Sequence, residues 1–230
     1  RIAQELKPQQ ITFYPLMKSP LTRDAIAKSL GVSDEDRELE FYKIITEEFK
    51  DCTQNNAWAF SKNSSTTLVD EYVCSNSDYV GIGSGAFSFL DGRLMINAFN
   101  LKEYEEKIKA GKSPVIGTCD FGRKETLQYV FLTKLFDGEL DIAGFNRENS
   151  ANIKKDLRVE LLLLKLVKAI YEENGKIKPT EFGSYLSVVL MKEFYTGMDK
   201  VRAAFRDDAK IKSTKKLKVM EYQEGVGIKE

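Results

Sequence analysis

The sequence predicts an α/β protein whose second half is mostly helical and has the pattern of a winged-helix module. Three observations support this fold class. A helical opening turn precedes a β-prone run at Ile11–Leu16, residues 51–100 hold short β-prone pieces between polar turns, and the last hundred residues follow helical periodicity.

The first fifty residues predict one strand and two helices. Pro8 ends the opening turn, and Ile11–Leu16 is typical of a buried strand that delivers a loop. Thr22–Leu30 is helical and ends at Gly31. A second helix, capped by Ser33, carries a wide apolar face that we expect to pack on a sheet; its members are Leu39, Phe41, Tyr42, Ile44, Ile45 and Phe49.

The middle of the chain predicts a small sheet. The expected strands are Ala57–Phe60, Thr67–Val73 and Tyr79–Ile82, followed by a hairpin in which Asp91-Gly92 joins Phe87–Leu90 to Arg93–Phe99. Next come a helix at Leu101–Ala110, an extended linker from Pro114 and a helix at Arg123–Phe136. We place a domain boundary near Gly117, which gives domains 1–117 and 118–230.

The C-terminal region predicts three further helices. Asn152–Glu173 is closed by Asn174-Gly175, Thr180 caps a helix through Tyr195, and Met198–Arg206 follows a break at Thr196-Gly197. A β-prone tail follows them, which completes the winged-helix pattern.

Composition excludes several kinds of catalytic site. The 230 residues include no histidine and only three cysteines. Without an imidazole, the chain cannot form a Ser-His-Asp or Cys-His system or a His-ligated zinc site. Cys52, Cys74 and Cys119 are far apart and lack metal-binding spacing, so we expect none of them to bind a metal. We expect all three to be free thiols in a reducing cytoplasm.

Charge argues against a nucleic-acid partner and against a membrane span. Lysine plus arginine and aspartate plus glutamate number 35 each, and acidic residues flank the basic tail Lys210–Lys218. The most apolar stretch, Leu157–Ile170, contains four charged residues. Because the chain begins at Arg1 with a helix-like turn, we expect it to be part of something longer.

The sharpest motif is a glycine-rich loop at Gly81, Gly83 and Gly85, preceded by strand-like residues. Alternate glycines let the backbone approach a flat or phosphorylated ligand and offer amides to it. A dinucleotide-binding loop needs a helix directly afterwards, whereas a hairpin is expected here. A tightly packed strand end remains the alternative.

Two aromatic segments accompany this loop. Phe13–Met17 ends the first strand, at the position where ligands of parallel α/β sheets bind. In Trp58–Lys62, alternating aromatic residues end in a cation, which suits a flat ligand that carries carboxylates. Core aromatics at a strand end and an ordinary edge strand are the structural alternatives.

Taken in order, these segments resemble the oxygen-independent coproporphyrinogen III oxidase family of radical S-adenosylmethionine (SAM) proteins. Leu6–Leu16 is similar to the family's last barrel strand, and Trp58–Lys62 is similar to its Phe-Ala-Arg segment. Asp78–Ser88 resembles the family's Gly-x-Gly-x-x-Ala-x-Ser signature, and Asn97, Tyr104 and the Gly111 turn follow in the family's order. Met191–Tyr195 resembles part of the helical C-terminal domain.

The resemblance implies the C-terminal end of a partial (β/α) barrel with a small β extension and a helical domain. In the family, an upstream Cys-x-x-x-Cys-x-x-Cys loop binds a [4Fe-4S] cluster, which cleaves SAM to a radical that abstracts substrate hydrogen. That loop is absent here, so we expect the upstream half of the barrel and an electron donor or acceptor as partners, and an inactive chain on its own.

The resemblance also assigns site residues. Tyr14 and Leu16 would offer backbone groups to the SAM adenine, and Pro15 would shape that loop. Gly81, Gly83 and Gly85 would line the cavity, and Phe87 would project toward substrate or a second SAM. The substrate contacts are expected from Trp58, Phe60, Lys62, Tyr72 and Asn97.

Two departures from the family leave the substrate open. Lys62 stands where arginine is usual, so a bidentate clamp on a propionate becomes a point-charge contact. The histidine that commonly precedes the family's tyrosine, matched here by Tyr72, is missing. The leading hypothesis is oxidative decarboxylation of porphyrinogen propionates. The alternatives are a haem chaperone, a related methyltransferase or haem-degrading enzyme, and a winged-helix interaction module that uses the Lys210–Lys218 tail.

Overall fold

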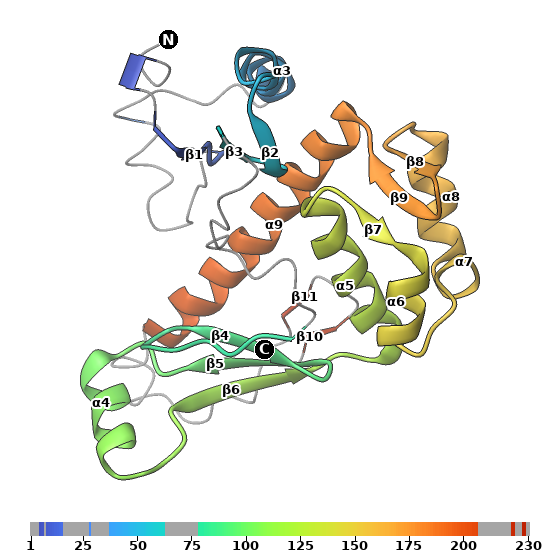
Figure 1. Ribbon diagram of the computed structural model, residues 1–230. Helices are drawn as coiled ribbons and strands as arrows, with labels where there is room; N and C mark the ends of the chain where they lie inside the picture. Colours follow the sequence, from blue (N-terminus) through green and yellow to red (C-terminus); the bar gives the residue numbers. More distant parts are fainter. Residues whose placement is uncertain are drawn as a thin grey trace. The chain divides into compact units, whose positions relative to one another are not determined.

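The computed structural model is a mixed α/β structure built from helices and small antiparallel sheets (Figure 1). It describes residues 5–6, 8–15, 28, 37–62, 78–206, 222–223 and 227–228. Most of the expected helix at 22–30, the expected strand at 67–73 and the basic tail lie outside the described residues, as do Leu16, Tyr72 and Cys74. None of the described helices is long and apolar enough to cross a membrane.

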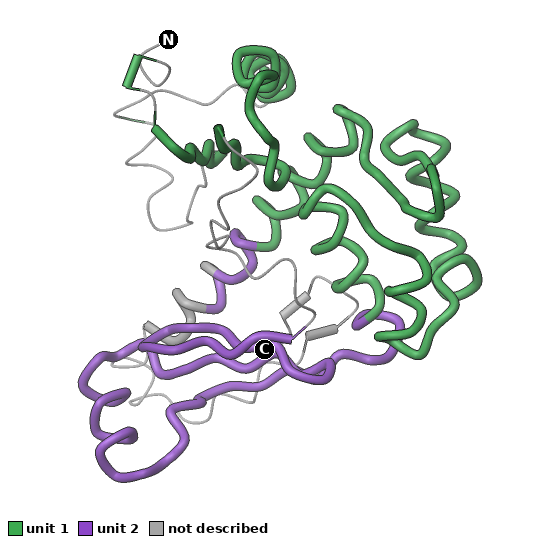
Figure 2. The backbone as a smooth tube through the Cα atoms, viewed as in Figure 1, with its two compact units in different colours: residues 1–18, 22–75, 127–194 green, residues 19–21, 76–126, 195–230 purple. Residues whose placement is uncertain are grey.

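The chain divides into two compact units, coloured separately in Figure 2. Unit 1 comprises residues 1–18, 22–75 and 127–194, and unit 2 comprises residues 19–21, 76–126 and 195–230. The domain boundary expected near Gly117 lies inside strand β6 (Val115–Asp120) of unit 2. The assignment of 1–117 and 118–230 to separate domains stays a prediction.

Unit 1 contains a small sheet covered by a helix. Strands β1 (Gln10–Thr12), β2 (Thr53–Asn56) and β3 (Ala59–Ser61) pair in the antiparallel order β1-β3-β2. Helix α3 (Glu38–Glu48) directs Tyr42 into the interior. The face predicted for this helix is only partly covered, because Phe41 and Ile44 remain 46% and 51% exposed.

Unit 1 also holds what we call the helix–wing segment. Its elements in order are α5 (Arg123–Phe136, of which 127 onward belongs to unit 1), β7 (Leu140–Asp141), α6 (Ile142–Glu148), α7 (Ile153–Asp156), α8 (Arg158–Leu166), β8 (Ile170–Glu173) and β9 (Lys176–Pro179). The strands form an antiparallel sheet in the order β7-β9-β8. This element order is that of a winged-helix module, with the β8–β9 hairpin as the wing.

The predicted helix at Asn152–Glu173 is wrong. The helical stretch bends at Leu157 and ends at Leu166, and Lys168 then adopts a φ of 56°. Asn174 and Gly175 both have positive φ angles, 51° and 74°, as a two-residue hairpin turn requires. Asn-Gly therefore joins two strands here instead of ending a helix, and the strand pair precedes the last helix instead of lying in the tail.

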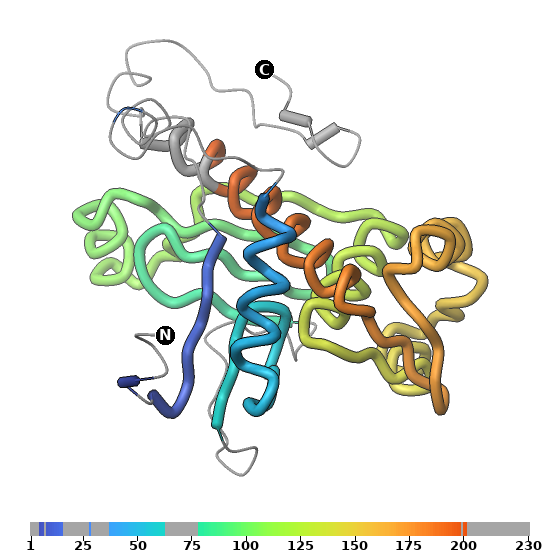
Figure 3. The backbone as a smooth tube through the Cα atoms, turned by 90° about the horizontal axis from the view of Figure 1, so that it is seen from above, coloured from blue at the N-terminus to red at the C-terminus, as the bar shows by residue number. Residues whose placement is uncertain are grey.

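The last helix, α9 (Glu181–Arg206), is continuous through Gly197, where the sequence predicts a break. Figure 3 shows α9 in orange passing beside α3 in blue. Lys192 of α9 and Glu38 of α3 form an ion pair at 2.7 Å, and both side chains are largely buried. This pair fixes the spacing of the two helices within unit 1.

Unit 2 is built on the antiparallel sheet β4 (Phe87–Leu90), β5 (Arg93–Asn97) and β6, with α4 (Leu101–Lys109) between β5 and β6. The predicted Asp91-Gly92 hairpin is confirmed. The extended linker predicted after Pro114 is the strand β6, which pairs with β5. The strand expected at Tyr79–Ile82 is reduced to one bridge between Tyr79 and Phe89. Two short strands, β10 (Tyr222–Gln223) and β11 (Gly227–Ile228), pair with each other.

Candidate functional site

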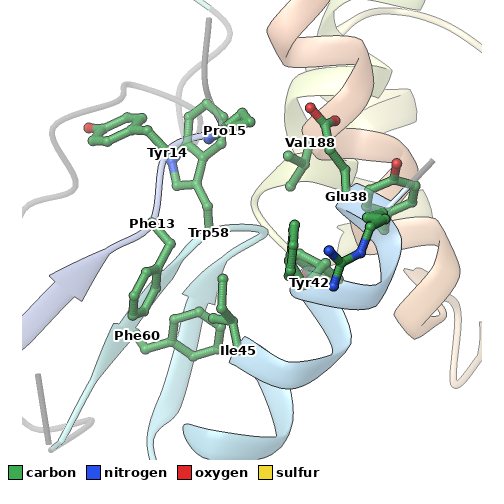
Figure 4. Close-up of a pocket in the computed structure, with 12 residues that line it drawn as sticks. Phe13, Tyr14, Pro15, Glu38, Tyr42, Ile45, Trp58, Phe60 and Val188 are labelled. Atoms are coloured by element: carbon green, nitrogen blue, oxygen red, sulfur yellow. The ribbon is translucent and has the colours of Figure 1, made fainter. Parts of the chain in front are cut away.

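Unit 1 contains an apolar cavity of about 460 Å³, open to solvent, between the end of β1, the β2–β3 turn, α3 and α9 (Figure 4). Its volume is within the usual range for small-molecule sites. The lining residues are Phe13, Tyr14, Pro15, Arg37, Glu38, Phe41, Tyr42, Ile45, Trp58, Phe60, Tyr185 and Val188. Four predicted site residues, Tyr14, Pro15, Trp58 and Phe60, are therefore brought together here.

Trp58 forms the centre of the aromatic wall. Its ring lies 5.1 Å from the Tyr14 ring and 4.6 Å, edge on, from the Phe136 ring, and the side chain is 1% exposed. Asn56 shapes the turn, because its Oδ1 accepts hydrogen bonds from the amides of Trp58 and Ala59 at 3.0 Å. These bonds therefore fix the backbone of the turn that carries the indole.

Phe13 and Phe60 extend this wall at the sheet. Their rings lie 6.1 Å apart, and the Phe13 amide donates to the Trp58 carbonyl at 2.9 Å. Phe49, just beyond α3, contacts both rings at 5.1 and 5.6 Å. Such edge and tilted arrangements suit aromatic packing and leave a rigid apolar surface for a flat ligand.

The opposite wall comes from α3 and α9, as Figure 4 shows for Tyr42, Ile45 and Val188. The Tyr42 hydroxyl donates to the Ala57 carbonyl at 2.8 Å, and burial raises the pKa of the phenol above its ordinary value. Sequence reasoning placed Tyr42 and Ile45 on an apolar face but did not assign them to the site. It missed Tyr185 and Val188, because α9 begins 120 residues after the end of β3 and has no motif that indicates a binding site.

The cation that lines the cavity is Arg37, not the predicted Lys62. Arg37 stacks over the Phe41 ring at 4.8 Å and pairs with Glu40 at 3.3 Å, and it remains half exposed. The Lys192 ion pair neutralises Glu38, the lining carboxylate. Lys62 is exposed and is not among the lining residues. Arg37 thus supplies the positive charge among the lining residues, and Glu40 is its partner in the structure.

The glycine loop lies in unit 2 and is held by its own neighbours. The amides of Gly81, Gly83 and Gly85 donate to Ser88 Oγ (2.9 Å), Tyr104 Oη (3.2 Å) and the Ala98 carbonyl (2.9 Å). These three amides therefore donate to neighbouring groups of unit 2, although the sequence suggested that a ligand would receive them. Ser88 and Tyr104 went unrecognised as the groups that hold it.

Asn97 ties this loop together from β5. Its Nδ2 donates to the carbonyls of both Gly81 and Gly83, at 3.1 and 3.0 Å, and the residue is 5% exposed. A Cβ on Gly81 would lie 2.1 Å from the Phe87 carbonyl oxygen, so the close approach of loop and strand requires glycine. The structure thus gives Asn97 a positioning role in the loop.

The ring of Phe87 is packed inside unit 2. Only 9% of the residue is exposed, whereas Val80 and Ile82 of the same loop are 66% and 89% exposed. The outward-facing residues of the loop therefore include these two aliphatic side chains and Ser84, and not the phenylalanine that the sequence singled out.

No group of three or more Cys, His, Asp or Glu side chains within the described residues could hold a metal ion. Cys52 and Cys119 form no disulfide and are partly buried. The cavity lining therefore offers aromatic walls and one arginine, a combination found in sites for small molecules.

Comparison with known proteins gives one structural likeness. No family model and no curated protein matches the sequence. The fold is similar to that of coproporphyrinogen III oxidase (HemN) from Escherichia coli, described as a radical SAM enzyme, with a TM-score of 0.59 and 14% sequence identity. The match covers 84% of this chain and 50% of that one, and at this identity it establishes similarity of fold alone.

Proposed function

We propose that this chain is the C-terminal half of a radical SAM oxidoreductase that acts on a tetrapyrrole, in the manner of coproporphyrinogen III oxidase. The observation that carries the proposal is the convergence of Tyr14, Pro15, Trp58 and Phe60 on one aromatic cavity. These residues come from segments more than 40 positions apart, and each belongs to a segment that resembles the family.

The chain's own residues would bind and orient the reactants. The aromatic walls accept a flat ring, such as a pyrrole or the SAM adenine, and Arg37 pairs with a propionate. Bound SAM and a [4Fe-4S] cluster, reduced by one electron from an external donor, would supply the radical that removes a propionate hydrogen. Loss of carbon dioxide and of one electron to an acceptor would then leave a vinyl group.

The edge of β1 supports the place of this chain in a larger barrel. Within the described residues every strand pair is antiparallel, and β1 has only β3 as a partner. A strand at the edge of a sheet has an unpaired row of backbone groups, which an upstream parallel strand of the barrel would occupy. The tetrapyrrole, the upstream half and the electron acceptor are part of this proposal, as is a cytoplasmic location.

The binding part of this proposal can be tested on the chain itself, because Trp58 is its one tryptophan and lies in the cavity wall. Titration with coproporphyrin III should quench the Trp58 emission in a saturable way. The variant Tyr14→Ala should weaken binding about tenfold, because it removes one aromatic contact, worth about 1 kcal/mol beyond its buried area. The exposed variant Leu101→Gln in unit 2 serves as the matched control.

The charge requirement needs a second titration, with the tetramethyl ester of coproporphyrin III. Arg37→Gln should weaken binding of the free acid several-fold and leave the ester unchanged, because only the acid carries carboxylates. Quenching that never saturates, or that Tyr14→Ala leaves unaltered, would contradict tetrapyrrole binding in this cavity. Tight haem binding by a full-length protein that shows no turnover would instead favour the haem chaperone.

A further inference from the structure

Helix α8 of the helix–wing segment exposes a continuous aliphatic stripe. Val159, Leu162, Leu163, Leu166 and Val167 are each more than half exposed, at 54–68%. Their spacing of i, i+3, i+4, i+7 and i+8 places them on one side of the helix. A stripe of this regularity on one short helix differs from scattered surface leucines and marks an interaction surface.

The opposite side of α8 is firmly anchored, so the stripe is not the result of a loosely placed helix. Leu157 and Leu161 are 0% and 6% exposed in the core cluster, and Leu164 packs against it. Glu160 accepts a hydrogen bond from Gln128 of α5 at 2.6 Å. The helix is therefore fixed by one side and presents the other to solvent.

In the element order, α8 stands where the second helix of a helix-turn-helix module stands, so its exposed side chains indicate whether it could read DNA. In helix-turn-helix modules, the second helix enters the major groove and uses polar and basic side chains to read base edges. The exposed side of α8 is aliphatic and can neither donate to nor accept from a base edge. This surface is therefore not suited to nucleic acid.

An anionic membrane fits the surface less well than a protein does. The stripe contains no aromatic residue and spans a nine-residue helix, whereas interfacial helices combine aromatic anchors with several unpaired cations. Lys154 is already paired with Glu172, at 2.6 Å. We call this aliphatic stripe the seam, and it is of the kind that packs against another helix.

The margin of the seam indicates the charge of its partner. Arg158 and Lys165 are seven residues apart and lie along the same margin, beside Leu162. Arg158 forms no ion pair with any residue in the described part of the chain, and Lys165 lies 3.6 Å from Glu172. We infer that α8 is a docking surface for an amphipathic helix of another protein, whose apolar stripe packs on the seam and whose acidic residues meet this cationic margin.

This inference does not depend on the proposed function, and its test involves no tetrapyrrole. The probe is a hydrocarbon-stapled helical peptide with leucines at i, i+3, i+4 and i+7 and glutamates beside them, compared with the same peptide carrying lysines. Fluorescence anisotropy with the complete 230-residue chain should show at least tenfold tighter binding of the glutamate peptide at low salt. Raising the salt concentration should reduce this preference.

Three variants make the test specific. The double variant Leu162→Gln and Leu166→Gln retains helix propensity and should lose binding at least tenfold, while Leu101→Gln should bind as the wild type does. Arg158→Glu should reduce the preference for the glutamate peptide several-fold. Circular dichroism spectra that match the wild type would show that each variant is folded.

Four results would overturn the inference. They are equal binding of the two peptides, unchanged binding by the double glutamine variant, binding to phosphatidylglycerol vesicles with no binding of either peptide, and a concentration-dependent dimer in sedimentation that the double variant abolishes while the peptide does not bind. The third result would assign the seam to a membrane, and the fourth to a second copy of the chain.

Discussion

Tyr42 links the candidate cavity to the stability of unit 1. Its ring lines the cavity, while its hydroxyl donates to the Ala57 carbonyl and accepts from Gln54 Nε2 at 3.2 Å. Ala57 precedes Trp58 in the β2–β3 turn, so the phenol fixes the turn that carries the indole. Burial is the main cause of the raised pKa of Tyr42, and the Gln54 and Ser184 hydrogen bonds oppose it.

Tyr42→Phe should lower the free energy of unfolding by about 1–2 kcal/mol at pH 8, because it leaves the buried Ala57 carbonyl without this donor. The raised pKa also gives the wild type a pH dependence. The contribution of the protonated Tyr42 phenol to the free energy of unfolding is complete below the unfolded-state pKa of about 10. It is lost as the pH rises through the higher folded-state pKa. Urea unfolding at pH 8 and pH 10.5 should therefore show a smaller alkaline loss in the variant.

Tyr171→Phe is the control for this measurement, since Tyr171 is 44% exposed on β8. It should unfold as the wild type does at both pH values. An equal alkaline loss in wild type and Tyr42→Phe would show that the Tyr42 phenol does not carry this pH dependence.

At the scale of elements, local patterns were predictable where a short segment determines its own structure. The Arg123–Phe136 helix and the Asp91-Gly92 hairpin are found as predicted, because periodicity and turn chemistry act over a few residues. The end of α8 could not be predicted from the leucine-rich run at 157–166, because apolar runs occur in both helices and strands. Residues 170–173 form a strand because they pair with β9 across the Asn174-Gly175 turn, and the apolar run contains no signal for that pairing.

Replacing glycine by alanine is expected to have opposite effects on stability at Gly81 and at Gly197. Gly81→Ala should destabilise the fold by about 1–3 kcal/mol, because its Cβ would overlap the Phe87 carbonyl. Gly197→Ala should stabilise it by up to about 1 kcal/mol, because Gly197 lies within α9 and its Cβ would meet no atom within 4 Å. Thermal unfolding measures both; a stabilising Gly81→Ala would show that the loop does not approach β4 this closely.

At the scale of the whole molecule, the sequence predicted only four of the twelve residues that line the candidate site. Tyr14, Pro15, Trp58 and Phe60 belong to recognisable segments and do line one cavity. Arg37, Tyr185 and Val188 have no motif, and only the folding of α3 and α9 against the sheet brings them there. The likeness to coproporphyrinogen III oxidase covers about half of that chain, so the activity of that enzyme is only proposed for this chain.

The most direct test of that proposal is anaerobic reconstitution of the full-length protein with iron and sulfide. The reconstituted protein is then incubated with SAM, a low-potential reductant and an electron acceptor, and the products are separated by chromatography. We expect 5′-deoxyadenosine to form together with the decarboxylated porphyrinogen when coproporphyrinogen III is supplied, and Tyr14→Ala and Arg37→Gln each to lower that yield. A reconstituted protein that forms no 5′-deoxyadenosine, with or without the porphyrinogen, would contradict the account.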